Sequence, residues 1–145
     1  MPFDLLGGGA GATPYTIPFP CFGGKSDGLG KFLNANGAST MADNASASRT
    51  RAPVAVPVGS TAKIVGCAYK TNLGTTNIGM QVHKNGIATQ AFTLANINLN
   101  KGGQENWVGF AVVAGDYIEL EWDSDAGSGD IPSESIWWLL MEITL

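Results

Sequence analysis

Short runs of alternating apolar and polar residues recur along this chain, and they are the feature that most limits its fold. In the stretch MQVHKNGIATQAFTL, Met80 and Val82 alternate with two polar residues, which is the period-2 pattern of a strand with one buried face. Asn85 and Gly86 then supply the positive φ angles that a type I′ turn needs. We therefore predict two strands joined by a tight hairpin.

Comparable runs between turn signals occupy most of the chain from about residue 28. None of the segments between them has the apolar spacing of an amphipathic helix, so eight short strands predict an all-β sandwich. The stretch ANGASTMADNASASRTRA has no period and is interpreted as a long surface connection. The eight runs are Gly28 to Asn34, Pro53 to Val58, Ala62 to Lys70, Asn77 to Lys84, Ile87 to Leu94, Trp107 to Val113, Asp116 to Trp122 and Ser135 to Thr144.

The first 24 residues differ in composition from residues 25–145, which we take as the folded domain. An apolar MPFDLL precedes a flexible GGGAGA and the proline-containing TPYTIPFP, which favours extended backbone. We interpret this region as an extended arm outside the core, so that deletion of residues 1–20 is expected to leave the sandwich folded. A disordered tail is the alternative, but the arm is too apolar for a solvated tail and is expected to dock on a partner. Its contact residues would be Phe3, Leu5, Leu6, Tyr15, Ile17 and Phe19.

The closing run SIWWLLMEITL is apolar on both faces of a strand. Trp137 shares one face with Leu139, and that row is expected to fill the core. An antiparallel sandwich strand normally leaves its other face to water, so the second apolar face needs a cover. A neighbouring subunit is the simplest cover, and the chain's own arm or a loop is the alternative. The predicted subunit interface comprises Ile136, Trp138 and Leu140.

The composition narrows the possible partners. Only 14% of residues are charged, 44% are hydrophobic, 20 are glycine and the net charge is −4, so much of the surface must be small, neutral or covered, as in an assembly subunit. The absence of a Lys/Arg cluster argues against nucleic acid and anionic lipid as partners. No stretch has the length of a membrane span or the basic start of a signal peptide, so we expect the protein to fold where it is made.

Few residues suggest chemistry, and we expect no catalytic residue, metal or cofactor. His83, the one histidine, lacks a second ligand or catalytic partner and is expected to be a half-exposed surface side chain. Cys21 and Cys67 could pair, but Cys67 alternates with apolar neighbours and is better explained as a small buried side chain. Glu119 and Glu121 have the spacing of a wet strand face rather than of a glycosidase pair.

The loop EWDSDAGSGD carries oxygen ligands that could suit calcium, but its spacing matches no dedicated site, and we favour a solvated loop. Whether it binds an ion stays open. The three carboxylates concerned are those of Asp123, Asp125 and Asp130.

Three segments together resemble a known family of modules. MQVHKNG, VAGDYIELEWDS and SESIWWLLMEI resemble the jelly-roll modules of the tumour-necrosis-factor and complement-globular-head type that occur in bacteriophage structural proteins. The matching turns are Lys84-Asn85-Gly86 and Gly115-Asp116, and the resemblance covers roughly residues 25 to 145. It implies an eight-stranded antiparallel jelly roll that assembles as a homotrimer in a virion.

Two virion roles use such a module. A tail-fibre head normally follows a long repetitive shaft, whereas the arm here is short, so we expect a non-enzymatic capsid decoration (cement) protein. It would bind the major capsid protein on the capsid exterior after assembly in the host cytoplasm. The alternative is a fibre tip or a receptor- or carbohydrate-binding head, for which exposed aromatic side chains would be the signature. Trp107 and Trp122 are candidates, but both alternate with apolar neighbours and are expected to fill the core.

Overall fold

The chain folds into ten β-strands in the computed structural model, which describes residues 13–24, 31–35, 42–43, 51–71, 78–94, 101–122 and 135–145. These residues include no helix, and hence none that could cross a membrane. The strands are β1 (Tyr15–Gly24), β2 (Lys31–Leu33), β3 (Ala42–Asp43), β4 (Ala52–Pro53), β5 (Thr61–Thr71), β6 (Ile78–Lys84), β7 (Ile87–Leu94), β8 (Lys101–Val112), β9 (Tyr117–Trp122) and β10 (Ser135–Thr144).

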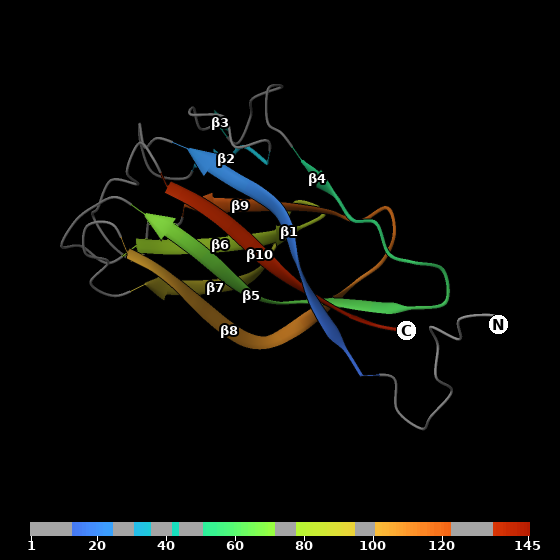
Figure 1. Ribbon diagram of the computed structural model, residues 1–145. Helices are drawn as coiled ribbons and strands as arrows, with labels where there is room; N and C mark the ends of the chain where they lie inside the picture. Colours follow the sequence, from blue (N-terminus) through green and yellow to red (C-terminus); the bar gives the residue numbers. More distant parts are fainter. Residues whose placement is uncertain are drawn as a thin grey trace.

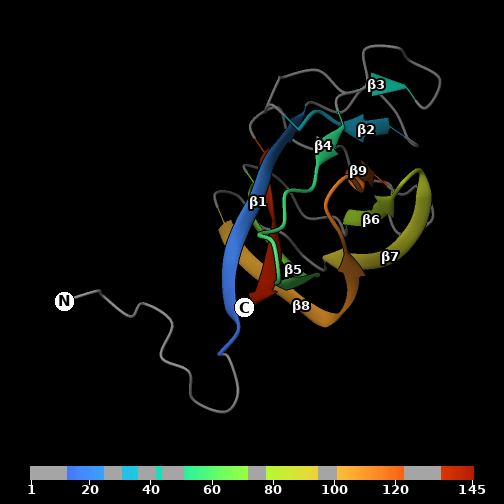
Figure 2. The ribbon, with the colours of Figure 1, turned by 90° about the vertical axis from the view of Figure 1, so that its right-hand side faces the viewer.

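The strands form two antiparallel sheets that pack face to face. The first has the order β1-β10-β5-β8, and the second has the order β3-β2-β9-β6-β7, with β4 paired to β9. The first sheet lies in front in Figure 1, and Figure 2 shows the two sheets from the side. When the two-residue strands β3 and β4 are left out, eight strands remain and can be counted along the chain. The first sheet then contains the first, eighth, third and sixth strands in that spatial order, and the second sheet contains the second, seventh, fourth and fifth. This is the strand order of a jelly roll, as predicted.

Each of the eight predicted runs contains a strand, although some limits differ. The run from Pro53 to Val58 is mostly a connection, since only its first residue belongs to β4, and β8 begins six residues before its predicted start. The hairpin between β6 and β7 is confirmed, because Asn85 and Gly86 have φ angles of 53° and 81°, as a type I′ turn requires. β3 lies within the stretch that was expected to be a surface connection.

The prediction that residues 1–24 form an arm outside the core is wrong for residues 15–24. They form β1, which pairs along its length with β10, and Phe19 and Phe22 are buried between the sheets. The prolines did not prevent this because β1 is an edge strand, where missing amide donors cost little. Phe19 therefore belongs to the core and cannot be a contact residue of an arm.

The core fills the space between the inward faces of the two sheets. The row beginning at Trp137 is buried as predicted as far as Ile143, whereas Leu145, which was expected in the same row, is 53% exposed. The Trp137 indole stacks on the Tyr69 ring at 5.3 Å. Cys67 is a free, buried thiol, which confirms its interpretation as a small core residue. The fully buried large side chains facing between the sheets are Phe22, Leu33, Ile64, Met80, Ile118, Leu120 and Trp137.

Candidate interaction surface

The outward face of the first sheet carries the three residues predicted to form a subunit interface. They lie on β10, which runs between β1 and β5 in the middle of the sheet. Ile136 is 37% exposed, and Trp138 and Leu140 are half-buried, whereas the residues between them point into the core. The sequence therefore assigned the two faces of β10 correctly. The structure brings these side chains together on one surface.

Small residues surround the two larger side chains of this surface. Ala68 lies opposite Trp138 on β5, and Gly66 lies opposite Leu140. A Cβ on Gly66 would lie 2.5 Å from the Glu105 carbonyl oxygen and 3.3 Å from Leu140 Cδ1, so the glycine lets β8 and the leucine side chain approach closely. Small residues thus lie beside Trp138 and Leu140 at the apolar centre of this face, so little bulk on β5 blocks the approach of another protein surface.

Polar side chains border this apolar centre. The next outward row on β10 begins with Glu142, whose carboxylate lies 2.9 Å from the Lys63 ammonium. On β8, Gln104 donates a hydrogen bond of 2.8 Å to Asn106. An apolar centre with a polar rim is the usual composition of a protein interface.

The residues predicted to form the arm contacts fall into three groups. Phe3, Leu5 and Leu6 lie outside the described residues. Tyr15 is 41% exposed and Ile17 is half-buried, both at the start of β1, and Phe19 belongs to the core. Of the residues predicted to form the arm, Tyr15–Gly24 thus belong to the sandwich as β1.

A second polar region lies on the outward face of the six-stranded sheet, where His83 is buried rather than half-exposed as expected. Its Nε2 lies 2.5 Å from a Glu121 carboxylate oxygen and 3.1 Å from the Gln81 amide oxygen, and its ring packs edge-on against Phe32. The prediction of a surface side chain was wrong because Phe32 on β2 covers this part of the face.

The prediction that Glu119 and Glu121 lie on a solvent-exposed face of a strand is also wrong for Glu119, which lies on β9. Glu119 is 1% exposed and forms an ion pair with Arg51 at 3.4 Å, and it lies opposite His83 in the strand register. Among the described residues, no group of three or more His, Cys, Asp or Glu side chains has the arrangement of a metal site. The candidate calcium ligands of the acidic loop lie outside the described residues.

The two turns that carry the family resemblance contact each other although they lie 30 residues apart in sequence. Asn85 Nδ2 donates to Asp116 Oδ1 at 2.7 Å, and the Asn85 side-chain oxygen accepts from the Tyr117 amide at 3.0 Å. The second Asp116 oxygen accepts from the Val113 amide at 2.9 Å and lies 3.1 Å from the Lys84 ammonium. These hydrogen bonds, with that of Asn85 foremost, lower the pKa of Asp116. The two turns therefore form one structural unit that joins the hairpin to the start of β9.

Of the tryptophans considered as carbohydrate platforms, Trp107 packs against the core. Its indole stacks on Phe92 at 5.2 Å and donates to the Ile64 carbonyl oxygen at 3.1 Å. The Trp122 side chain lies outside what the structure describes. Trp138, which the sequence assigned to a subunit interface, is partly exposed on the outward face of the first sheet. The alternation of residues along β10 shows which face carries Trp138, but it does not show that the neighbouring side chains leave the indole partly exposed.

Comparison with known proteins gives no identification. No protein-family model matches the chain, and no curated protein matches it significantly.

Proposed function

We propose that the protein is a non-enzymatic structural protein of a bacteriophage virion, a homotrimeric decoration (cement) protein that binds the outer surface of the capsid. The observation that carries the proposal is the outward face of β10, where Ile136, Trp138 and Leu140 form an apolar centre on a jelly-roll sheet. The low charge of the chain supports it, because 14% charged residues leave a surface suited to contact with other proteins.

Assembly through this face would bury the second apolar side of the closing strand. In a closed ring of three copies, this face of one copy would contact a different surface of its neighbour, and the same contact would repeat three times. The Lys63–Glu142 pair would lie at the wetter border, where an ion pair contributes little to affinity but helps to fix orientation. The remaining arm residues Phe3, Leu5 and Leu6 would fasten the trimer to the major capsid protein.

Two adjacent substitutions test the assembly. Trp138→Ala should shift the protein from trimer to monomer in sedimentation velocity at micromolar concentration, with the protomer still folded. Trp137→Ala should instead lower the free energy of unfolding by about 3–5 kcal/mol, because it leaves a cavity in the core. Ile87→Ala, which removes another exposed apolar side chain, should change neither property. A monomeric wild-type protein would contradict the trimer.

The alternative is a trimeric fibre tip or a receptor- or carbohydrate-binding head. If the trimer formed through another surface, the part-exposed Trp138 would favour this role, because an accessible indole can stack on a sugar ring. Immunogold electron microscopy of virions that contain the protein separates the two roles. Label spread over the capsid supports decoration, and label confined to the tail end supports the alternative. Binding to host surface sugars on a glycan array would also favour the alternative.

A further inference from the structure

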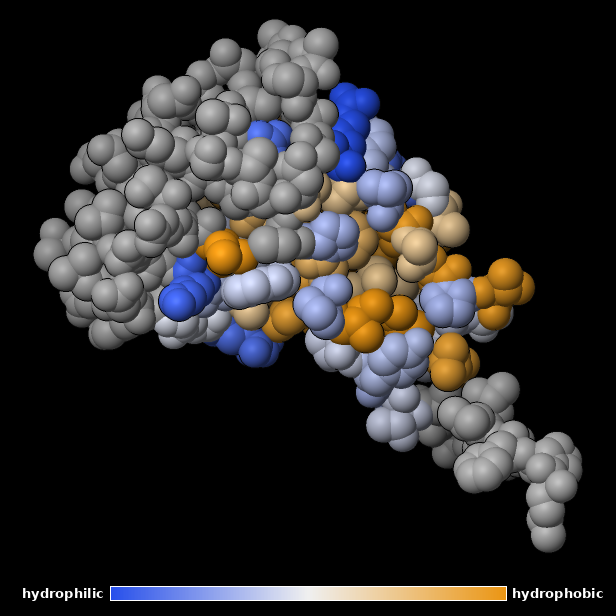
Figure 3. All heavy atoms as spheres, turned by 45° about the horizontal axis from the view of Figure 1, so that its top comes forward, coloured by the Kyte–Doolittle hydropathy of each residue, from blue (hydrophilic) through white to orange (hydrophobic). Residues whose placement is uncertain are grey.

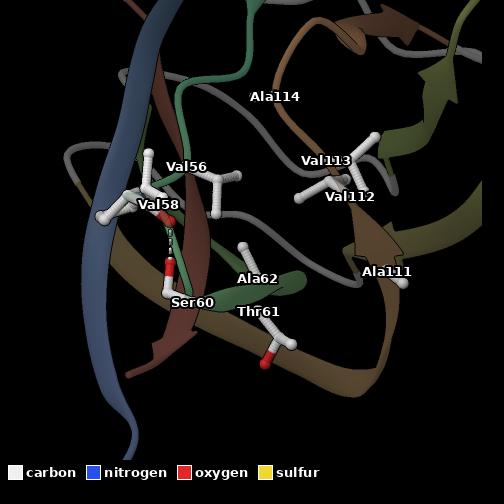
Figure 4. A pocket seen from close by; sticks show the side chains of 10 residues that line it. Val56, Val58, Ser60, Thr61, Ala62, Ala111, Val112, Val113 and Ala114 are labelled. Carbon is white, nitrogen blue, oxygen red and sulfur yellow. Dashed lines mark hydrogen bonds between the residues drawn. The ribbon is translucent and has the colours of Figure 1, made fainter.

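An apolar hollow opens at one end of the sandwich, between the connection that precedes β5 and the end of β8. Its volume is about 360 Å³, and Figure 4 shows side chains from both segments around it. Ala62 and Val112 form its buried floor, whereas Val58 and Val113 are exposed at its rim. The lining residues that matter here are Val56, Val58, Ala62, Val112, Val113 and Ala114.

The same end of the molecule collects most of the exposed large apolar side chains. Of the seven in the described residues, five flank strand ends that meet here, and Figure 3 shows hydrophobic surface gathering toward this side. The five are Tyr15, Val58, Ile87, Val113 and Leu145. An exposed apolar surface of this kind around a hollow indicates a docking site.

The amino-terminal segment joins the sandwich beside this hollow. Tyr15 pairs with Ile143, Ile143 with Ala62, and Ala62 with Val112, so these residues form one row across all four strands of the first sheet. Two inter-strand spacings separate Tyr15 from the floor of the hollow, a distance of about 10 Å. The chain therefore enters the fold on the row that forms the floor.

The length of the preceding chain fits this distance. Residues 1–6 are Met-Pro-Phe-Asp-Leu-Leu, and eight residues rich in glycine and alanine separate them from Tyr15. Eight extended residues reach about 26 Å, which is enough to turn back over about 10 Å. A tether this short holds the apolar segment at an effective concentration on the order of millimolar.

We propose that in the free protein residues 1–6 of the same chain occupy this hollow, with Phe3, Leu5 and Leu6 covering its valines. The inference builds on the proposed function in one respect, since these are the residues proposed to fasten the trimer to the shell. The hollow would hold residues 1–6 until the capsid surface competes for them. In the free protein, the segment would shield the apolar rim of the hollow from water.

Disulfide trapping tests the position of the segment in the purified full chain. Leu5→Cys combined with Val58→Cys, in a Cys21→Ser background, should form an intramolecular disulfide roughly tenfold faster than Leu5→Cys combined with Ile87→Cys, because occupation of the hollow holds residue 5 at its rim. Ile87 is exposed at the same end of the molecule but does not line the hollow, so tethering alone gives it no comparable advantage or disadvantage. Equal rates would overturn the proposal. Covalent dimers in place of the intramolecular product would assign the hollow to a neighbouring copy and also overturn it.

Hydrogen exchange gives an independent measurement without new cysteines. Amides of residues 3–6 should exchange roughly tenfold more slowly in the wild type than in Val58→Asp, which places a charge at the rim, since a tenfold change corresponds to loss of a modest apolar contact. Ile87→Asp is the matched control, because Ile87 is exposed at the same end but does not line the hollow. Exchange at the rate of an unstructured peptide in the wild type would overturn the proposal. Neither result depends on the trimer or the capsid, so a failure here is distinguishable from failure of the proposed function.

Discussion

The contact between the two turns can be measured by a double-mutant cycle on Asn85 and Asp116. Asn85→Gly removes the side chain but keeps a residue that accepts a φ of 53°, and Asp116→Ala removes the carboxylate. Asp116 is 9% exposed, and its loss leaves the donors of Asn85 and Val113 without their acceptor. Hydrogen bonds to a charged group contribute about 1.5–3 kcal/mol each and are not additive, so we expect Asp116→Ala to cost about 2–4 kcal/mol.

The coupling energy between the two substitutions should be about 1.5–3 kcal/mol, because one charge-assisted hydrogen bond joins the two side chains directly. Urea unfolding of the wild type, both single variants and the double variant gives this number. Asn85→Gly combined with Glu142→Ala is the control cycle, since Glu142 pairs with Lys63 and not with either turn. Additivity of Asn85→Gly and Asp116→Ala within about 0.5 kcal/mol would refute the reasoning.

The same pair predicts how stability depends on pH. The Asn85 hydrogen bond, with those of Val113 and Lys84, lowers the pKa of Asp116 below its ordinary value of 3.8. Since the unfolded chain then binds the proton more readily, the contribution of this carboxylate is complete above about pH 5 and is lost as pH falls through the folded-state pKa. The stability difference between wild type and Asp116→Asn should therefore shrink below about pH 4. A difference that stays constant from pH 6 to pH 2.5 would contradict this assignment.

Three further predictions follow from the core and the sheet. A chain lacking residues 1–12 should keep its circular dichroism spectrum and cooperative unfolding, whereas one lacking residues 1–22 should not fold, because Phe19 and Phe22 are core residues. Cys67 should resist alkylation at pH 8 until the protein unfolds, because burial, with a smaller effect of Glu105, raises the pKa of its thiol to about 12. Gly66→Ala should cost about 1–3 kcal/mol in urea unfolding, since the new methyl group would lie 2.5 Å from a backbone oxygen, and Ala68→Gly, the opposite change two residues away, should cost less.

Alternation along single strands accounts for the parts of the fold that the sequence predicted. Trp137 and Trp138 point to opposite faces because neighbouring residues of a strand must, and Asn85-Gly86 forms a type I′ turn because few other pairs accept two positive φ angles. These are local properties of the backbone. The contact between Asn85 and Asp116, by contrast, follows from the jelly-roll order, which brings together two turns that no local pattern relates.

The wrong predictions for His83 and Glu119 have one physical cause, which is that a period shows which residues share a face but not what covers that face. His83 and Glu119 lie on the outward side of their sheet as alternation requires, yet both are buried, and Phe32 packs against His83 from another strand. Phe19 lies in a stretch whose prolines favoured an arm, yet β10 had an edge that β1 could pair with. The same reasoning applies to the face of β10 that carries Trp138. In a single chain Ile136 is exposed and Trp138 and Leu140 are half-buried, and the sequence pattern does not show what covers them; the trimer proposed above would do so.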